Sequence, residues 1–242
     1  MKPSSSSLFG SVQPLQWAMA VCGALAMLSS HWGFFSLYAV LKPLTMVLAM
    51  VCVWQEADRL AQPTGTWLLL AGLGLSLVGD VCLLVPEGFI PGLLAFLLAH
   101  MAYITLFGRD APWIAHKPAA LVVLAVGATT YAYLWTHGLP TGLRIPVGVY
   151  VLVIALMASQ AIGRAAFLRT PGARWVAWGA VSFMASDTIL AVDKFVQPLP
   201  GVAFGVLGSY YVAQWLIVHG MLQVLRHQHQ HQHQHQHQNN SY

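Results

Sequence analysis

Apolar runs about as long as a bilayer is thick fill most of this 242-residue chain. About 20 residues of α-helix cross the hydrocarbon core of a bilayer. The segments between the runs are rich in proline and glycine, which favour turns, and they are too short to hold a soluble domain. The sequence therefore predicts an all-α polytopic membrane protein with eight transmembrane helices, at about residues 14–31, 34–54, 67–85, 89–107, 119–136, 143–162, 175–193 and 201–225.

The composition supports a membrane protein. The chain is 57% hydrophobic and only 7% charged, whereas a soluble domain carries about 25% charged residues. The basic residues are spread between the runs, which argues against a nucleic-acid partner because such a partner needs a clustered basic face. The three cysteines fall in three different runs, a spacing that predicts neither a disulfide framework nor a zinc site.

The basic residues outside the runs favour one orientation, since short cytoplasmic loops carry an excess of Lys and Arg. With a cytoplasmic N-terminus, the outer loops hold only Arg144 and Lys194. The inner segments then hold Lys2, Arg59, Arg109, Lys117, Arg164, Arg169, Arg174 and Arg226. We expect an integral membrane protein with both termini in the cytoplasm, in the plasma membrane or, in a bacterium, the inner membrane.

Three regions follow from this pattern. Residues 1–13 form a polar N-terminal segment, and residues 14–225 form the transmembrane domain. In residues 226–242 His and Gln alternate before a short polar end, which indicates a disordered tail or a purification tag.

Two of the runs contain an aspartate in matching surroundings. Asp80 follows Gly79, Asp187 follows Ser186, and a leucine stands three residues after each aspartate. The match suggests two weakly related halves of four helices each. An ionised side chain in hydrocarbon costs several kcal/mol unless it is paired or neutralised, so both aspartates require an explanation.

Lys42 belongs with the two aspartates. At about 1.5 Å per residue, it lies roughly 12 Å deep from the outer end of its run, and Asp80 and Asp187 lie roughly 7–9 Å deep. One interpretation is a structural ion pair between Lys42 and one aspartate. Because such a pair explains two charges and not three, the pattern favours a polar pocket shared by all three in the outer half of the membrane.

Aromatic and polar residues accompany each aspartate on the next run. Phe96, His100 and Tyr103 share one helix face after Asp80, and Tyr210 and Gln214 follow Asp187 in the last run. His100 is either a hydrogen-bonded core residue or a proton carrier beside the acidic pair. No Gly-x-Ser-x-Gly or His-Glu-x-x-His motif occurs, which argues against a serine hydrolase and a zinc protease.

Together these motifs resemble the YhhN family of membrane proteins, which includes the lysoplasmalogenases. The resemblance extends from about residue 34 to residue 222. It rests on Lys42-Pro43, Gly79-Asp80 with Leu83, Phe89 and Gly92, Phe96 with His100 and Tyr103, Ser186-Asp187 with Phe195, and Tyr210-Tyr211 with Gln214. It implies a hydrolase that cleaves the vinyl ether bond of a lysoplasmalogen, a single-chain glycerophospholipid, to a fatty aldehyde and glycerophosphocholine or glycerophosphoethanolamine. Asp80 and Asp187 would be the catalytic carboxylates. The chemistry of this reaction requires no metal or organic cofactor.

The residues suit that chemistry. A vinyl ether hydrolyses when an acid protonates its β-carbon, and the resulting oxocarbenium ion takes up water and collapses to an aldehyde and an alcohol. Two carboxyl groups divide such work in glycosidases, one protonated and one ionised. Either aspartate could be the acid. Lys42, His100, Tyr210 and Gln214, with Tyr103 as a further support, would position the head-group or the water of a lysophospholipid entering from the outer leaflet.

Two other classes of protein use paired carboxylates in a membrane. An intramembrane aspartyl protease requires a glycine where this chain has Leu77 and a tyrosine where it has Ser186, so both departures count against it. A proton-coupled transporter is also compatible with repeated halves and buried carboxylates. The head-group, the chain length and the oligomeric state stay open at this point.

Overall fold

A computed structural model describes residues 14–57 and 63–239, with side chains up to Gln228. Its described part is helical and contains no strand. The helices are α1 (Pro14–His31), α2 (Phe35–Glu56), α3 (Pro63–Cys82), α4 (Phe89–Phe107), α5 (Lys117–His137), α6 (Arg144–Leu168), α7 (Pro171–Phe195) and α8 (Val202–Asn239). Two short 3-10 turns, Pro86–Gly88 and Thr141–Leu143, precede α4 and α6.

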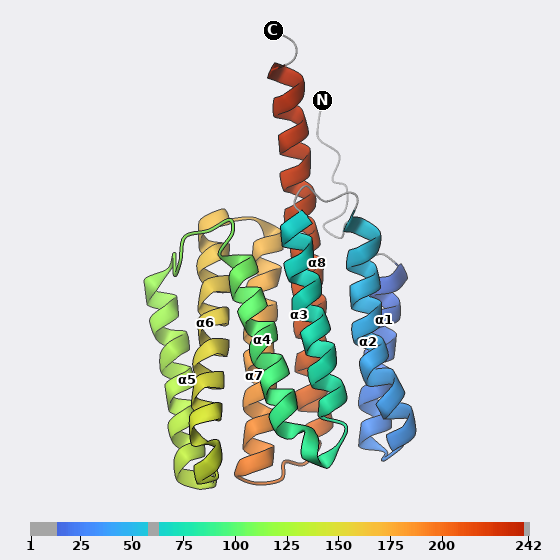
Figure 1. Cartoon of the computed structure of the whole chain (residues 1–242), viewed down its shortest axis with the longest axis vertical. Coiled ribbons are helices and arrows are strands. Elements are labelled where there is room, and N and C mark those ends of the chain that lie inside the picture. The colour runs from blue at the N-terminus through green and yellow to red at the C-terminus, as the bar shows by residue number, and fades with distance from the viewer. Residues whose placement is uncertain (1–13, 58–62, 240–242) are drawn as a thin grey trace.

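The helices form an up-and-down bundle (Figure 1) in which α1 begins and α8 ends at the same end. Short connections force consecutive helices to run antiparallel, so helices adjacent in sequence pack together. The most extensive of these contacts joins α7 to α8 and the next joins α3 to α4. Contacts of α4 with α6 and of α8 with α1, α2 and α3 close the bundle.

The eight predicted helices are confirmed, with boundaries that differ by a few residues except at the end of α8. Seven of the described helices, α2 to α8, are long and apolar enough to cross a membrane. The shorter α1 is less apolar, since it contains Gln16 and ends in two serines and a histidine. It nevertheless lies along the bundle beside α2 and α8.

The exterior is suited to lipid. Bulky apolar side chains cover it, and several tryptophans stand near the helix ends with more than half of their surface exposed, namely Trp17, Trp32, Trp54, Trp67, Trp113 and Trp178. Tryptophan concentrates at the two interfaces of a bilayer, where its ring lies at the level of the head-groups. We conclude that the chain is an integral multi-pass membrane protein.

The described cations are distributed unequally between the two ends. The end at which α8 projects from the bundle has basic residues in the loops and first or last turns of the helices, namely Arg109, Lys117, Arg169 and Arg174. Arg226 of α8 lies at the same end, because it pairs with Glu56, the last residue of α2. The other end has Arg144 and Lys194. Lys2 and Arg59, which entered the same prediction, lie outside the described residues.

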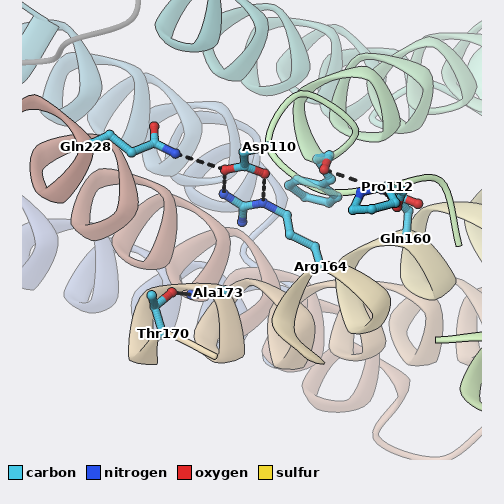
Figure 2. A network of polar contacts seen from close by, with 8 residues as sticks. Asp110, Pro112, Gln160, Arg164, Thr170, Ala173 and Gln228 are labelled. Atoms are coloured by element: carbon cyan, nitrogen blue, oxygen red, sulfur yellow. Dashed lines mark hydrogen bonds and ion pairs between the residues drawn. The ribbon is translucent and has the colours of Figure 1, made fainter. Parts of the chain in front are cut away.

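A buried polar clamp holds the loop between α4 and α5 at the end of the bundle from which α8 projects (Figure 2). Arg164 of α6 is fully buried and binds the carboxylate of Asp110 with two hydrogen bonds of 2.6 and 2.7 Å. Gln228 of α8 donates to the same carboxylate at 3.2 Å, and Gln160 accepts from the backbone N–H of Ile114 at 2.9 Å. The clamp therefore joins α6, α8 and the loop.

The segment expected to be a disordered tail differs in the structure. The α8 helix continues through the alternating His and Gln residues to Asn239. This segment contains neither proline nor glycine, and extending an existing helix needs no new nucleation. The expected polar segment 1–13 and residues 240–242 lie outside the described part of the chain.

Candidate active site

Asp80 lies in the last turn of α3 and is almost completely buried. A negative charge is unfavourable near the C-terminal end of a helix, so its neighbours must stabilise it. Nζ of Lys42 on α2 lies 3.3 Å from Oδ1 of Asp80, and the hydroxyl of Tyr210 on α8 donates to Oδ2 at 2.7 Å. The ring of Tyr38 lies below the Lys42 ammonium, 5.7 Å away. The helices α2 and α8 thus supply partners that favour the ionised carboxylate.

Asp187 lies within α7 and has different surroundings. The Tyr150 hydroxyl of α6 donates a hydrogen bond to its Oδ2. No cation lies within ion-pair distance of Asp187 among the described residues. The two carboxyl groups are nevertheless linked through side chains in contact with one another, namely Tyr210, Phe183, His100 and Tyr150. They therefore belong to one region of the bundle.

Aromatic rings fill the space between the two aspartates. The rings of Phe96, Phe183 and Tyr210 meet edge to face, with centroids 5.3 to 6.1 Å apart. His100 lies beside Phe183 at 4.7 Å and beside Tyr150 at 5.3 Å. It is fully buried, and neither of its ring nitrogens has a hydrogen-bond partner among the described residues.

The other two predicted supporting residues lie one helical turn farther from the aspartates. Tyr103 of α4 donates to Oε1 of Gln214 on α8 at 3.0 Å. Two buried polar atoms nearby have no hydrogen-bond partner in the described residues, namely the Ser76 hydroxyl and Nε2 of Gln214. Buried polar groups normally have a partner, which is often water.

A narrow cavity of about 60 Å³, hereafter the apolar cavity, opens beside Asp187 between α4, α5, α6 and α7. Apart from Asp187 and Tyr150, its polar lining consists of two threonines, Thr130 and Thr188. The remaining lining is aliphatic or aromatic, and it includes Leu93, Phe96, Leu134, Val147, Ile154 and Phe195. A carboxyl group that faces such a cavity could transfer a proton to an apolar molecule bound there.

A second cavity of about 430 Å³, hereafter the polar cavity, lies at the end of the bundle opposite to the α8 projection. Its charged lining residues are Lys42, Asp193 and Lys194. Leu83, Phe89 and Leu190 line both cavities. The two cavities are therefore neighbours that share one wall.

The structure brings most of the predicted site residues together but pairs them in an unexpected way. Lys42 forms an ion pair with Asp80, as the ion-pair interpretation had it. Asp187 lies close by, and no ion pair joins it to a cation within residues 14–57 and 63–228. The helix that follows each aspartate does not provide its hydrogen-bond partner. Instead, α8 provides Tyr210 for Asp80 and α6 provides Tyr150 for Asp187. Tyr150 was not among the predicted site residues, although a tyrosine within an apolar run needs a buried partner for its hydroxyl.

The comparisons with known proteins agree with these motifs. The model of the YhhN family matches residues 37–221, a range that contains every residue of the site. This chain belongs to the YhhN family. No solved structure matches it.

Curated relatives of this YhhN protein carry a functional name. It is 33% identical to the human protein named lysoplasmalogenase TMEM86B over 66% of this chain and 67% of the relative. It is 34% identical to the mouse protein of that name over 76% and 75% of the two chains. It is also 33% identical to the lysoplasmalogenase of Mycobacterium tuberculosis over 76% and 71%. Its described residues contain no cluster of three or more potential metal ligands.

Proposed function

We propose that this YhhN protein is a membrane hydrolase that cleaves the vinyl ether bond of lysoplasmalogens. The observation that carries the proposal is the difference between its two aspartates. Asp80 has a cation 3.3 Å away, whereas Asp187 has no cation at that range in the described part of the chain and faces an apolar cavity. The proposed reaction uses this difference, with a protonated carboxyl group as the acid and an ionised carboxyl group as its partner. The names of the curated relatives support the same substrate class.

Asp187 is the acid in this proposal. With Oδ2 accepting from Tyr150, the proton resides on Oδ1 and can be passed to the β-carbon of an alkenyl chain in the apolar cavity. Protonation converts the vinyl ether to an oxocarbenium ion. Loss of the proton converts Asp187 to a carboxylate. Its negative charge stabilises the adjacent oxocarbenium ion in a cavity of low polarity.

Asp80 is the ionised partner in this proposal. Lys42 and Tyr210 hold it as a carboxylate. Water adds to the cationic carbon and transfers a proton to a carboxylate, which gives a hemiacetal. The hemiacetal collapses to a fatty aldehyde and a glycerophospho-alcohol. The ring of His100 lies beside Tyr150, and neither of its nitrogens has a hydrogen-bond partner among the described residues, so in this proposal His100 orients that water.

The topology supports a particular direction of entry. The basic residues gather at the end from which α8 projects, and by the excess of basic residues in cytoplasmic loops this end faces the cytoplasm. Both termini then lie in the cytoplasm, and the polar cavity opens toward the outer leaflet. A lysophospholipid would enter from that leaflet with its chain between the helices.

Aldehyde release tests the proposal directly. Purified protein in mixed micelles receives an alkenyl lysophospholipid, and the matching alkyl-ether lysophospholipid serves as the control substrate. We expect aldehyde from the vinyl ether only, and a loss of at least about a hundredfold, the scale of general acid catalysis, in both Asp187→Asn and Asp80→Asn. A well-folded wild type that releases no aldehyde would overturn the proposal.

Tyr150→Phe tests the position of the acid. The substitution removes only the hydroxyl that orients Asp187, and a hydrogen bond to a carboxylate contributes about 1.5–3 kcal/mol. We expect kcat to fall about ten- to a hundredfold while the thermal unfolding temperature changes little. Tyr131→Phe is the matched control, because the Tyr131 hydroxyl donates to the backbone carbonyl of Arg144 and does not line the apolar cavity. Equal losses in the two variants would contradict a role for Tyr150.

A further inference from the structure

The polar cavity contains charges of both signs that the reaction does not use. Lys42 is committed to Asp80, which leaves Lys194 and Asp193 at the C-terminal end of α7. Lys194 is exposed, and the structure shows no ion pair for it in the described part of the chain. Its ammonium lies 4.8 Å from the centre of the Phe89 ring. Phe89 lines both cavities, so the Lys194 charge stands where they adjoin.

Asp193 is held in place by the turn that follows α7. Its Oδ1 accepts a hydrogen bond of 2.8 Å from the backbone N–H of Leu199. The other carboxylate oxygen has no hydrogen bond among the described residues, and the side chain is only partly buried. The polar cavity thus presents a fixed negative group and an unpaired positive group from consecutive residues.

We propose that the polar cavity binds the zwitterionic head-group of a single-chain phospholipid, with Lys194 on the phosphate and Asp193 on the ammonium group. This inference deepens the proposed function and rests on it for the place of the reaction. The opposite charges of Lys194 and Asp193 match the two charges of a phosphocholine or phosphoethanolamine group. A charge-assisted hydrogen bond from an ammonium group is a strong way to hold a phosphate.

The shared wall of the two cavities favours a lipid over a free anion. In a lysophospholipid, the glycerol unit joins the phosphate to the vinyl ether and the chain. With the phosphate at Lys194, the glycerol would pass Phe89 and the vinyl ether would reach Asp187 in the apolar cavity. That cavity is narrow, so it suits one hydrocarbon chain better than the two of a diacyl phospholipid.

Lys194→Met tests the phosphate contact, since methionine keeps an unbranched stem and removes the charge. The readouts are KM and kcat for an alkenyl lysophosphatidylethanolamine and for a neutral alkenylglycerol that has no phosphate. We expect KM for the phospholipid to rise about tenfold, the scale of one charge-assisted hydrogen bond in a partly solvated site. The kcat should change little, and KM for alkenylglycerol should stay the same. Lys194→Arg should restore the phospholipid KM.

Asp193→Asn tests the ammonium contact. The amide oxygen of asparagine can still accept from Leu199, so the turn after α7 is retained. We expect KM to rise for the zwitterionic substrate and not for alkenyl glycerophosphate, which has no ammonium group. An equal KM change for the charged and neutral substrates in Lys194→Met would overturn the head-group site. An unchanged KM for the zwitterionic substrate in both Lys194→Met and Asp193→Asn would overturn it as well.

A binding measurement separates this inference from the proposed function. Calorimetric titration with a non-hydrolysable alkyl-ether lysophospholipid needs no catalysis. If the wild type releases no aldehyde but binds this lipid more tightly than Lys194→Met does, the hydrolase is refuted and the head-group site is supported. Aldehyde release with an affinity and KM independent of Lys194 would support the hydrolase and refute the head-group site.

Discussion

Replacing Lys42 with methionine should destabilise the bundle more than the substitution of an exposed residue does, because it leaves the Asp80 charge without its cation. At 3.3 Å and an effective dielectric constant of about 20, the attraction between two unit charges is about 5 kcal/mol. Removing one partner of a buried ion pair typically costs about 3–5 kcal/mol. Methionine keeps most of the apolar stem, so we expect a loss of this size in the free energy of unfolding.

Asp80→Asn should cost less, because Lys42 lines the polar cavity and can be solvated there, whereas Asp80 lines neither cavity. The double variant Lys42→Met with Asp80→Asn removes both charges and should recover much of the loss. Unfolding by SDS in mixed micelles, followed by the fluorescence of the nine tryptophans, gives the free energy for each variant. Strictly additive effects in the double variant would refute the coupling of the pair.

Two further substitutions test packing and the polar clamp. Gly79→Ala should lower stability by about 1–3 kcal/mol, the usual cost of overpacking, since the added methyl group would come within 2.6 Å of the Phe96 ring. Gly142→Ala is its control in the same SDS titration, because a methyl group there meets nothing within 4 Å. Arg164→Met should cost about 3–5 kcal/mol, because it leaves the partly buried Asp110 carboxylate without its cation. The substitution Arg174→Met at an exposed position should stay within about 0.5 kcal/mol. Similar values for the two arginine variants, measured by heating in detergent, would contradict the clamp.

The sequence was sufficient to predict the helices. Apolar runs and the proline- and glycine-rich turns between them define each helix, because a membrane-spanning segment must satisfy its backbone hydrogen bonds internally. The largest difference concerns the end of α8, since the His and Gln residues contain no helix-breaking signal. The ends of α6 and α7 also extend beyond the predicted runs, because polar residues at the interface can continue a helix without being part of an apolar run.

The composition of the site could be predicted only in part. The rarity of charge in the runs singled out Lys42, Asp80 and Asp187, and their depths placed them in one layer. Their pairing could not be predicted, because helices that are apolar on all sides have no polar face to indicate which neighbour each side meets. Tyr150 was missed for the same reason, since its role depends on the contact between α6 and α7 rather than on its sequence neighbours.

The Asp80 carboxylate also constrains how the chain can enter a membrane during synthesis. Its cation, Lys42, lies on the preceding helix, but its phenol partner, Tyr210, follows 130 residues later. Asp80 therefore enters the bilayer with α2 beside it and long before α8 exists. Insertion of α2 and α3 as one hairpin lets Lys42 neutralise Asp80 at once, so the ion pair serves the growing chain before it serves the finished site.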